Sequence, residues 1–105
     1  MVKFSKAAVT AGVSEWMKAE PGRTEFIMYC MGAMMLGHWG DVCDEDAATN
    51  NDALESGARL MGVYPILDKW VAGSGGEDTI WIIIDAVQDD QGNRGPMTAL
   101  FPQEY

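Results

Sequence analysis

The sequence is most informative about the fold between Gly37 and Leu60, where it runs GHWGDVCDEDAATNNDALESGARL. Two glycines bracket His38 and Trp39, a pattern typical of a sharp turn that carries a large ring. A helix is predicted from about Asp44 to Ser56, because acidic residues favour the first turn of a helix. Gly57 should end this helix, since glycine takes the left-handed position after a helix at no steric cost.

Three strands are predicted in the second half of the chain. Apolar and other residues alternate from Leu60 to Tyr64, which is the period of a strand. Thr79–Val87, TIWIIIDAV, is apolar until Asp85 and is typical of a central strand covered on both faces. Met97–Phe101 should return as a last strand after a glycine-rich hairpin loop, DDQGNRGP. The connection at 65–79 contains GSGGED, which indicates a hairpin end and not a phosphate loop, because a strand follows it.

The first part of the chain carries a weaker signal. A short strand is predicted around Ala7–Val9. A helix capped by Ser14 should begin at Glu15 and end before Pro21. Together these elements predict one α+β domain over residues 1–105, with about three helices packed on a three- to four-stranded antiparallel sheet whose C-terminal strands form a meander.

A second helix, capped by Thr24, should run from Glu25 to about Leu36. It is apolar on almost every side and rich in methionine. Such a helix either lies at the centre of a core or is partly covered by another chain. Because a small domain cannot easily bury every face of a helix, Phe26–Leu36 is also a candidate homodimer surface.

The predicted helix at 44–56 is weakly amphipathic. Ala47, Asn50 and Leu54 share one face, and Asn50 is expected to make structural hydrogen bonds there. Leu54 and Trp81 are expected to fill the helix–sheet core, where truncation to alanine is costly. The outward side chains should be Asp46, Asn51, Asp52 and Glu55.

The charge balance restricts the class of partner. Sixteen aspartates and glutamates against seven lysines and arginines give a net charge of −9, and no lysine or arginine occurs from Glu25 to Ser56. This balance argues against direct nucleic-acid binding through phosphate neutralisation. It suits a basic protein partner, and equally a merely soluble surface. Without a signal peptide or an apolar run of membrane-spanning length, the protein is expected in the cytoplasm and off the membrane.

No catalytic residue, cofactor or metal ligand is predicted. A hydrolase triad would have to use His38, the only histidine, and no nucleophile motif surrounds Cys30 or Cys43. These three residues and Asp41 are zinc-competent types, but their spacing matches no common site. Asp41, Asp44 and Asp46 alternate as calcium ligands do, without the glycine and distant glutamate of an EF-hand. Both cysteines are expected as free thiols.

Several motifs resemble a small bacterial family carried on plasmids and integrative elements, often labelled "plasmid-related protein" or type I restriction modification subunit. The matching residues, over about two thirds of the chain, are Trp39-Gly40-Asp41, Glu45-Asp46, Asn50, Ala53-Leu54, Gly57, Arg59-Leu60, Tyr64, Ile80-Trp81-Ile82-Ile83, Leu100, Pro102 and Glu104-Tyr105. The resemblance implies a mobile genetic element but no activity, cofactor or catalytic residue.

The sequence also departs from this family. Cys43 stands where family members tend to have serine or threonine, the natural cap of the acidic helix. The loops before and after the Ile80-Trp81 strand are longer, and a methionine-rich extension precedes His38. These differences suggest that the added segments serve a partner particular to this protein.

Two functional hypotheses follow. The first is a non-enzymatic acidic protein that occupies a basic groove on a host or defence-system protein, as anti-restriction and anti-CRISPR proteins that imitate DNA do. Its candidate partner-binding residues are Asp41, Asp44, Glu45, Asp46, Asp52, Glu55, Asp89 and Asp90. The alternative is a small enzyme or ligand-binding domain with a pocket near His38, Trp39 and Asp41.

Overall fold

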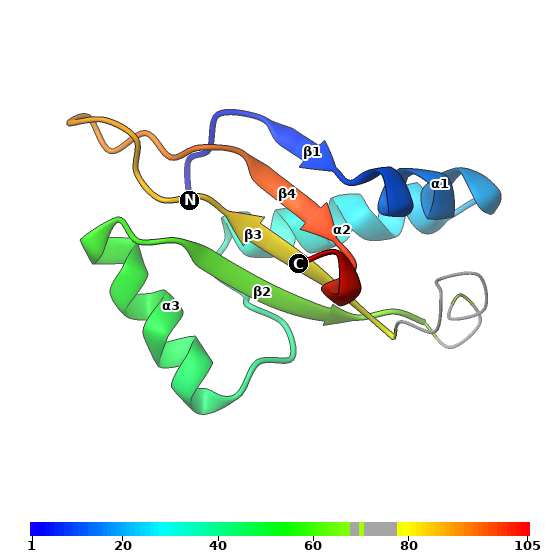
Figure 1. Cartoon of the computed structure of the whole chain (residues 1–105). Coiled ribbons are helices and arrows are strands. Elements are labelled where there is room, and N and C mark those ends of the chain that lie inside the picture. The colour runs from blue at the N-terminus through cyan, green and yellow to red at the C-terminus, as the bar shows by residue number, and fades with distance from the viewer. Residues whose placement is uncertain (68–69, 71–77) are drawn as a thin grey trace.

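The computed structural model describes residues 1–67, 70 and 78–105. In chain order its elements are β1 (Ala7–Val9), α1 (Ala11–Ala19), α2 (Arg23–Met35), α3 (Asp44–Ser56), β2 (Leu60–Pro65), β3 (Thr79–Ile84), β4 (Met97–Leu100) and the 3-10 helix η1 (Pro102–Glu104) (Figure 1). Helices and a single sheet therefore form the α+β fold that the sequence predicts. The predicted hairpin end at 73–78 lies outside the described residues, except for Asp78.

The sheet has the strand order β1-β4-β3-β2. β3 lies between β2 and β4 and is antiparallel to both, which confirms the predicted meander. The prediction of a purely antiparallel sheet was wrong, because β1 pairs with β4 in parallel. No hairpin joins β1 to another strand, so its direction is set by the path of the chain into the helices and not by a turn.

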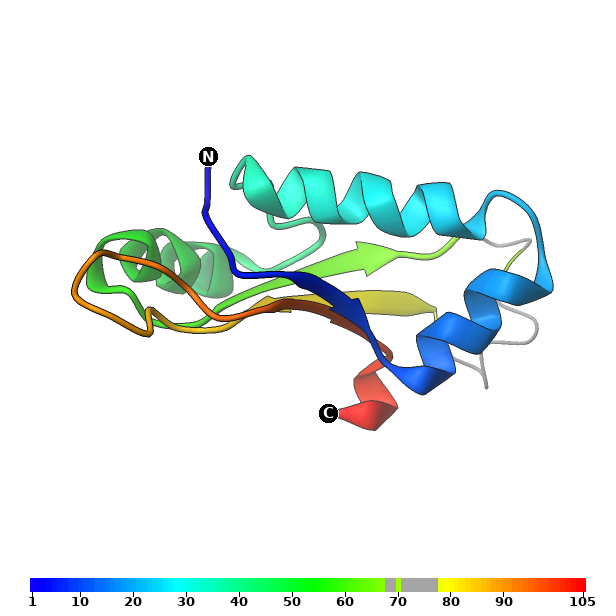
Figure 2. The same ribbon diagram turned by 90° about the horizontal axis from the view of Figure 1, so that it is seen from above.

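The two faces of β3 have different covers. Ile80, Ile82 and Ile84 are fully buried on the face that α2 covers (Figure 2). On the opposite face Trp81 is half-buried, with its ring centroid 5.4 Å from that of Tyr105. The expectation that Trp81 fills the helix–sheet core was wrong, since alternation along a strand sends it to the other face.

The first two helices begin earlier than predicted. The Thr10 hydroxyl accepts a hydrogen bond from the Val13 amide at 3.3 Å, so Thr10 and not Ser14 caps α1. α2 starts at Arg23 after Gly22, whose φ of 93° turns the chain into the helix. Thr24 therefore lies inside α2 and does not cap it. A glycine in the left-handed region supplied the turn in place of a side-chain cap.

Candidate interaction surface

α3 is fixed along the open edge of β2 by the side chain of Asn50. The Asn50 Nδ2 donates to the Met61 carbonyl at 2.8 Å, and the Met61 amide donates to Asn50 Oδ1 at 3.1 Å. The side-chain amide thereby pairs the edge strand as another strand would. The prediction that Asn50 is a structural hydrogen-bonding residue is confirmed.

Residues 39–41 extend this cover along the same edge. The Val63 amide donates to the Trp39 carbonyl at 3.0 Å, and the Asp41 amide donates to the Val63 carbonyl at 2.6 Å. Gly40 has a φ of 76°, and a Cβ there would collide with the Val63 carbonyl oxygen. Trp39 is buried and its ring N–H donates to Asn51 Oδ1 at 3.1 Å, which ties this segment to α3.

Leu54 does not lie in the core, contrary to the sequence-based expectation. Its side chain is 45% exposed, whereas the neighbouring Ala53 is buried. α3 docks on a strand edge through a small residue and an amide, and such a narrow contact leaves no room for leucine. The core face of α3 is therefore defined by Asn50 and Ala53.

The outward side of α3 carries an acidic stripe. Asp44, Asp52 and Glu55 are exposed and are spaced by about two turns and one turn of helix, so they share one side, and Glu45 flanks Asp44. Asp44 and Glu45 also lie in the first helical turn, where negative charge stabilises the helix dipole. Cys43 is the N-cap residue and its side chain makes no cap hydrogen bond.

Asp46 lies elsewhere on the helix. It follows Asp44 by two residues, which turns its side chain roughly 200° around the axis. It lines a small pocket of about 120 Å³ together with Asn50, Arg59 and Met61. Arg59 is exposed, and its guanidinium carbon lies 5.3 Å from the centroid of the Tyr105 ring. Asp46 is therefore separate from the acidic stripe and close to a cation.

The remaining predicted partner-binding residues flank α3 at its two ends. Asp41 is exposed just before the helix, and Asp89 and Asp90 are exposed on the hairpin loop after β3. This loop lies on the side of the molecule where α3 ends (Figures 1 and 2). The Asp89 carboxylate accepts hydrogen bonds from the Asn93 side chain and from the Asn93 and Gln91 amides, and these lower its pKa below the usual range.

The C-terminal end of α3 is capped by Arg94, a contact that the sequence did not reveal. Its guanidinium donates to the Ala53 carbonyl at 2.8 Å and to the Ala58 carbonyl at 2.6 Å. The last turn of α3 has no basic residue of its own, so Arg94 complements the helix dipole from a distant loop. Because Arg94 is only 6% exposed, it neutralises little of the negative charge on the nearby surface.

The residues considered for catalysis or metal binding lie in different surroundings. Cys30 is buried in α2, where burial raises the pKa of its thiol to about 12, whereas Cys43 is exposed. The His38 carbonyl accepts a hydrogen bond from the Tyr64 hydroxyl at 2.6 Å. Within residues 1–67, 70 and 78–105, no three His, Cys, Asp or Glu side chains are grouped to hold a metal ion.

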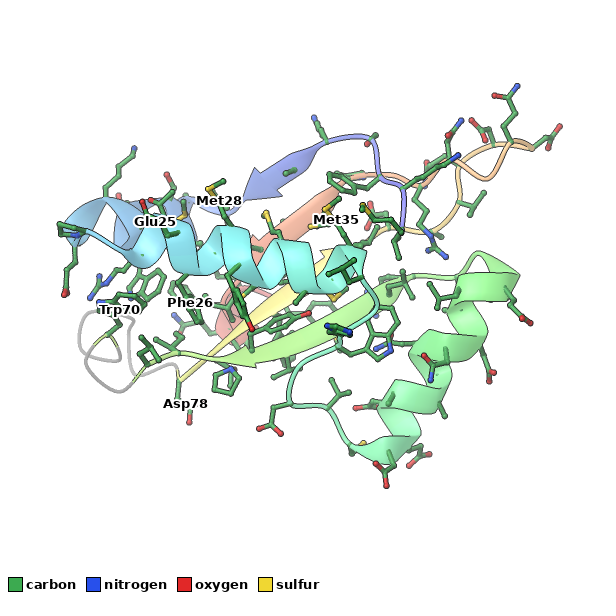
Figure 3. All side chains as sticks on the ribbon, turned by 180° about the vertical axis from the view of Figure 1, so that it is seen from behind. Glu25, Phe26, Met28, Met35, Trp70 and Asp78 are labelled. Atoms are coloured by element: carbon green, nitrogen blue, oxygen red, sulfur yellow. The ribbon has the colours of Figure 1, made fainter. Side chains whose placement is uncertain are left out.

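The outer side of α2 is a second unusual surface. Ile27, Cys30 and Met34 face the core, but Met28 is 65% exposed and Tyr29 is 74% exposed. Figure 3 shows Met28 and Met35 on the same side of this helix. A Cβ on Gly32 would meet nothing within 4 Å, so no contact of the described chain requires glycine at this position.

Comparison of the chain with protein-family models, with curated proteins and with solved structures gives no match. No helix in the described part of the chain is both long enough and apolar enough to cross a membrane.

Proposed function

We propose that this protein is a non-enzymatic, acidic interaction protein that places α3 in a basic groove of another protein. The observation that carries the proposal is the acidic stripe of Asp44, Glu45, Asp52 and Glu55, on a helix without any lysine or arginine. The helix presents these carboxylates as a rigid set, because Asn50, Trp39 and Arg94 fix it to the rest of the fold.

The average density of these charges along the helix approaches that of the phosphates along one DNA strand. Four outward carboxylates lie along a helix of 13 residues, which is about 20 Å long. The density is about one charge per 5 Å, against about 3.4 Å along one strand of B-DNA. Asp41, Asp89 and Asp90 add negative charge near the helix ends. Each exposed carboxylate contributes little alone, so recognition would depend on the set.

The resemblance to the "plasmid-related" family adds a biological setting to this proposal. A protein of a mobile element gains from blocking the enzymes that attack incoming DNA, and these enzymes expose basic grooves. The partner is therefore proposed to be a cytoplasmic host or defence-system protein whose groove normally holds DNA, as for anti-restriction or anti-CRISPR proteins. The acidic stripe would act as a DNA mimic in that groove.

The proposal is tested with a variant that removes three of the four charges of the stripe, Asp44→Asn, Asp52→Asn and Glu55→Gln together; it is called the stripe variant. Wild type immobilised through its C-terminus is expected to capture a basic protein from a host lysate. Bound protein should elute steeply with salt and be displaced by a short duplex DNA. The stripe variant should lose most of this capture while keeping the circular dichroism spectrum of wild type.

A second triple variant provides the matched control. Glu15→Gln, Glu25→Gln and Asp85→Asn remove the same charge from exposed positions outside the stripe. This control should capture the partner as wild type does. Equal losses in both variants would mean that only net charge matters. Undiminished capture by the stripe variant, or indifference to duplex DNA, would contradict the mimic proposal.

We also propose that two copies associate through the outer side of α2. A two-fold axis near Gly32 would bring Met28 of one copy against Leu36 of the other, and both side chains are exposed. Gly32 would allow the two helices to approach closely. Sedimentation should show a concentration-dependent dimer that Met28→Glu abolishes and Lys18→Glu leaves intact. A wild-type chain that stays monomeric at millimolar concentration would contradict the dimer.

A further inference from the structure

A groove of about 470 Å³ lies at the end of α2 and is separate from the acidic stripe. Four segments border it: residues 1–3, the end of α2 with Gly37, Leu54 of α3, and Gln91, Gly92 and Arg94 of the hairpin loop. Figure 2 shows the first residues of the chain beside the C-terminal end of α2. The Val2 amide donates to the Met35 carbonyl at 2.8 Å, which holds that segment in place.

One part of the groove's lining is apolar, and the rest is polar. Met1, Leu36 and Leu54 are among the exposed large hydrophobic residues of the chain, and all three line it. Met35 and Val2, each partly buried, continue the same wall. Leu54 of α3, which is too exposed to stabilise the core, thus forms part of this wall. The volume is within the range of small-molecule sites.

The charged side chains of the groove are all basic. Lys3 and Arg94 line it, and no aspartate or glutamate does, although the chain has more than twice as many acidic as basic residues. Lys3 is exposed, and neither cation forms an ion pair with any residue in the described ranges. The groove therefore has a local positive charge on a protein of net charge −9.

Arg94 lines this groove and has no carboxylate partner within the described residues. Two hydrogen bonds to carbonyls of α3 and the following residues fix the guanidinium, which has five N–H donors in all. Carbonyl groups carry no net charge, and buried charges are normally paired with an opposite one. Burial accordingly lowers the pKa of Arg94 from its ordinary value. An anion in the groove would supply the missing partner.

We propose that this groove binds a small amphipathic anion, with a carboxylate placed between Lys3 and Arg94 and an apolar body placed against Leu36 and Leu54. The charge of the groove selects an acid over a neutral or basic molecule. The apolar part of the lining, which includes Leu36 and Leu54, favours a ligand with an alkyl or aryl body. This site does not depend on the proposed function of α3. It uses the Leu36 side chain that the proposed α2 dimer would cover, so octanoate is expected to bind the monomer.

The test uses octanoate as the probe and octanamide, of nearly the same shape but neutral, as its control. Amide resonances of residues 35–37 and 91–94 should shift saturably with octanoate, with a Kd of about 1 mM, as expected for a ligand of this size. Octanamide should bind about tenfold more weakly. Lys3→Gln should weaken octanoate binding about fivefold, whereas Lys6→Gln, at an exposed lysine outside the groove, should not change it.

A second variant examines the apolar wall without disturbing Arg94. Leu36→Asp places a negative charge at an exposed position of the groove and should abolish octanoate binding, while thermal unfolding stays close to that of wild type. Equal binding of octanoate and octanamide would overturn the proposal. Equal effects of Lys3→Gln and Lys6→Gln, or shifts spread over the whole surface, would overturn it too. Binding to an acidic peptide but not to octanoate would replace the small molecule with a protein ligand.

Discussion

Two buried arginines, Arg23 and Arg94, cap the C-terminal ends of two different helices. The Arg23 guanidinium donates to the Trp16 carbonyl of α1 at 2.9 Å, as Arg94 donates to the Ala53 carbonyl of α3. Arg23 is 4% exposed and also pairs with Glu20 at 3.2 Å. Its guanidinium carbon lies 4.7 Å from the centroid of the Trp16 ring. Arg94 has the same task and the same burial without a carboxylate.

The difference is that Arg23 is ion-paired, whereas Arg94 lines a groove without an acidic residue in its lining. Arg23 donates to the Trp16 carbonyl and pairs with Glu20, and Trp70 joins them by donating its ring N–H to Glu20 at 3.1 Å. Arg94 instead lies at the wall of a groove that also contains Lys3. Arg23 already has a carboxylate partner, whereas Arg94 has none within the described residues and could pair with an anion in the groove.

Of the two arginines, Arg23 is expected to show the larger effect when it is replaced. Arg23→Met should lower the free energy of unfolding by about 3 kcal/mol, because Glu20 and the Trp16 carbonyl both lose their partner. A urea melt followed by tryptophan fluorescence measures this loss. A loss below about 1 kcal/mol would show that the ion pair makes no net contribution to the free energy of unfolding. Arg23 would then stabilise the fold no more than Arg94 does.

Arg94→Met should cost less, about 2 kcal/mol, because only carbonyl contacts are lost and an uncompensated charge leaves the interior. The loss should be local to α3, so hydrogen exchange should rise most at residues 53–58. Arg94→Lys keeps the charge but not both hydrogen bonds, so its free energy of unfolding should lie between those of wild type and Arg94→Met. Greater destabilisation than in Arg23→Met would reverse the comparison.

Leu54 lies in the same region as Arg94 but outside the core, so its truncation should have a small effect. Leu54→Ala should change the free energy of unfolding by less than about 1 kcal/mol, since the side chain is 45% exposed. Replacing buried Ile82 by alanine provides the contrast and should cost about 2–5 kcal/mol. Similar losses for the two variants would place Leu54 in the core after all.

The smallest effect concerns Asp89, the acidic residue of the Arg94 loop. The Asp89 carboxylate accepts hydrogen bonds from Asn93 and Gln91, so its pKa should lie below the usual value. These hydrogen bonds order the loop, and the order should be lost only as the pH falls through that lowered pKa. Carboxyl carbon shifts in an NMR titration measure this pKa. Arg94→Met should leave this pKa unchanged, whereas a rise would identify Asp89 as the missing counter-ion.

Periodicity and end signals explain why parts of the fold could be predicted. α3 was correctly bounded because its acidic first turn and Gly57 are local signals, and Gly57 does take a φ of 83°. β3 was recognised from its isoleucines, although it ends at Ile84 and not at Val87. Asn50 was recognised as structural because a polar residue on a buried face needs partners. The resemblance and the acidic-mimic function stay predictions.

By itself, the sequence determined an α+β domain, a central apolar strand and a helix that is acidic along its outer side. Each of these depends on residues close together in the chain, whose side-chain spacing is set by helix or strand geometry. Only the tertiary structure decided that β1 is parallel to β4, that Leu54 is exposed and that Arg94 caps α3 across 41 residues. Such contacts join segments whose local patterns carry no information about each other. The basic groove between Lys3 and Arg94 arises in the same way, since no stretch of sequence contains both of its cations.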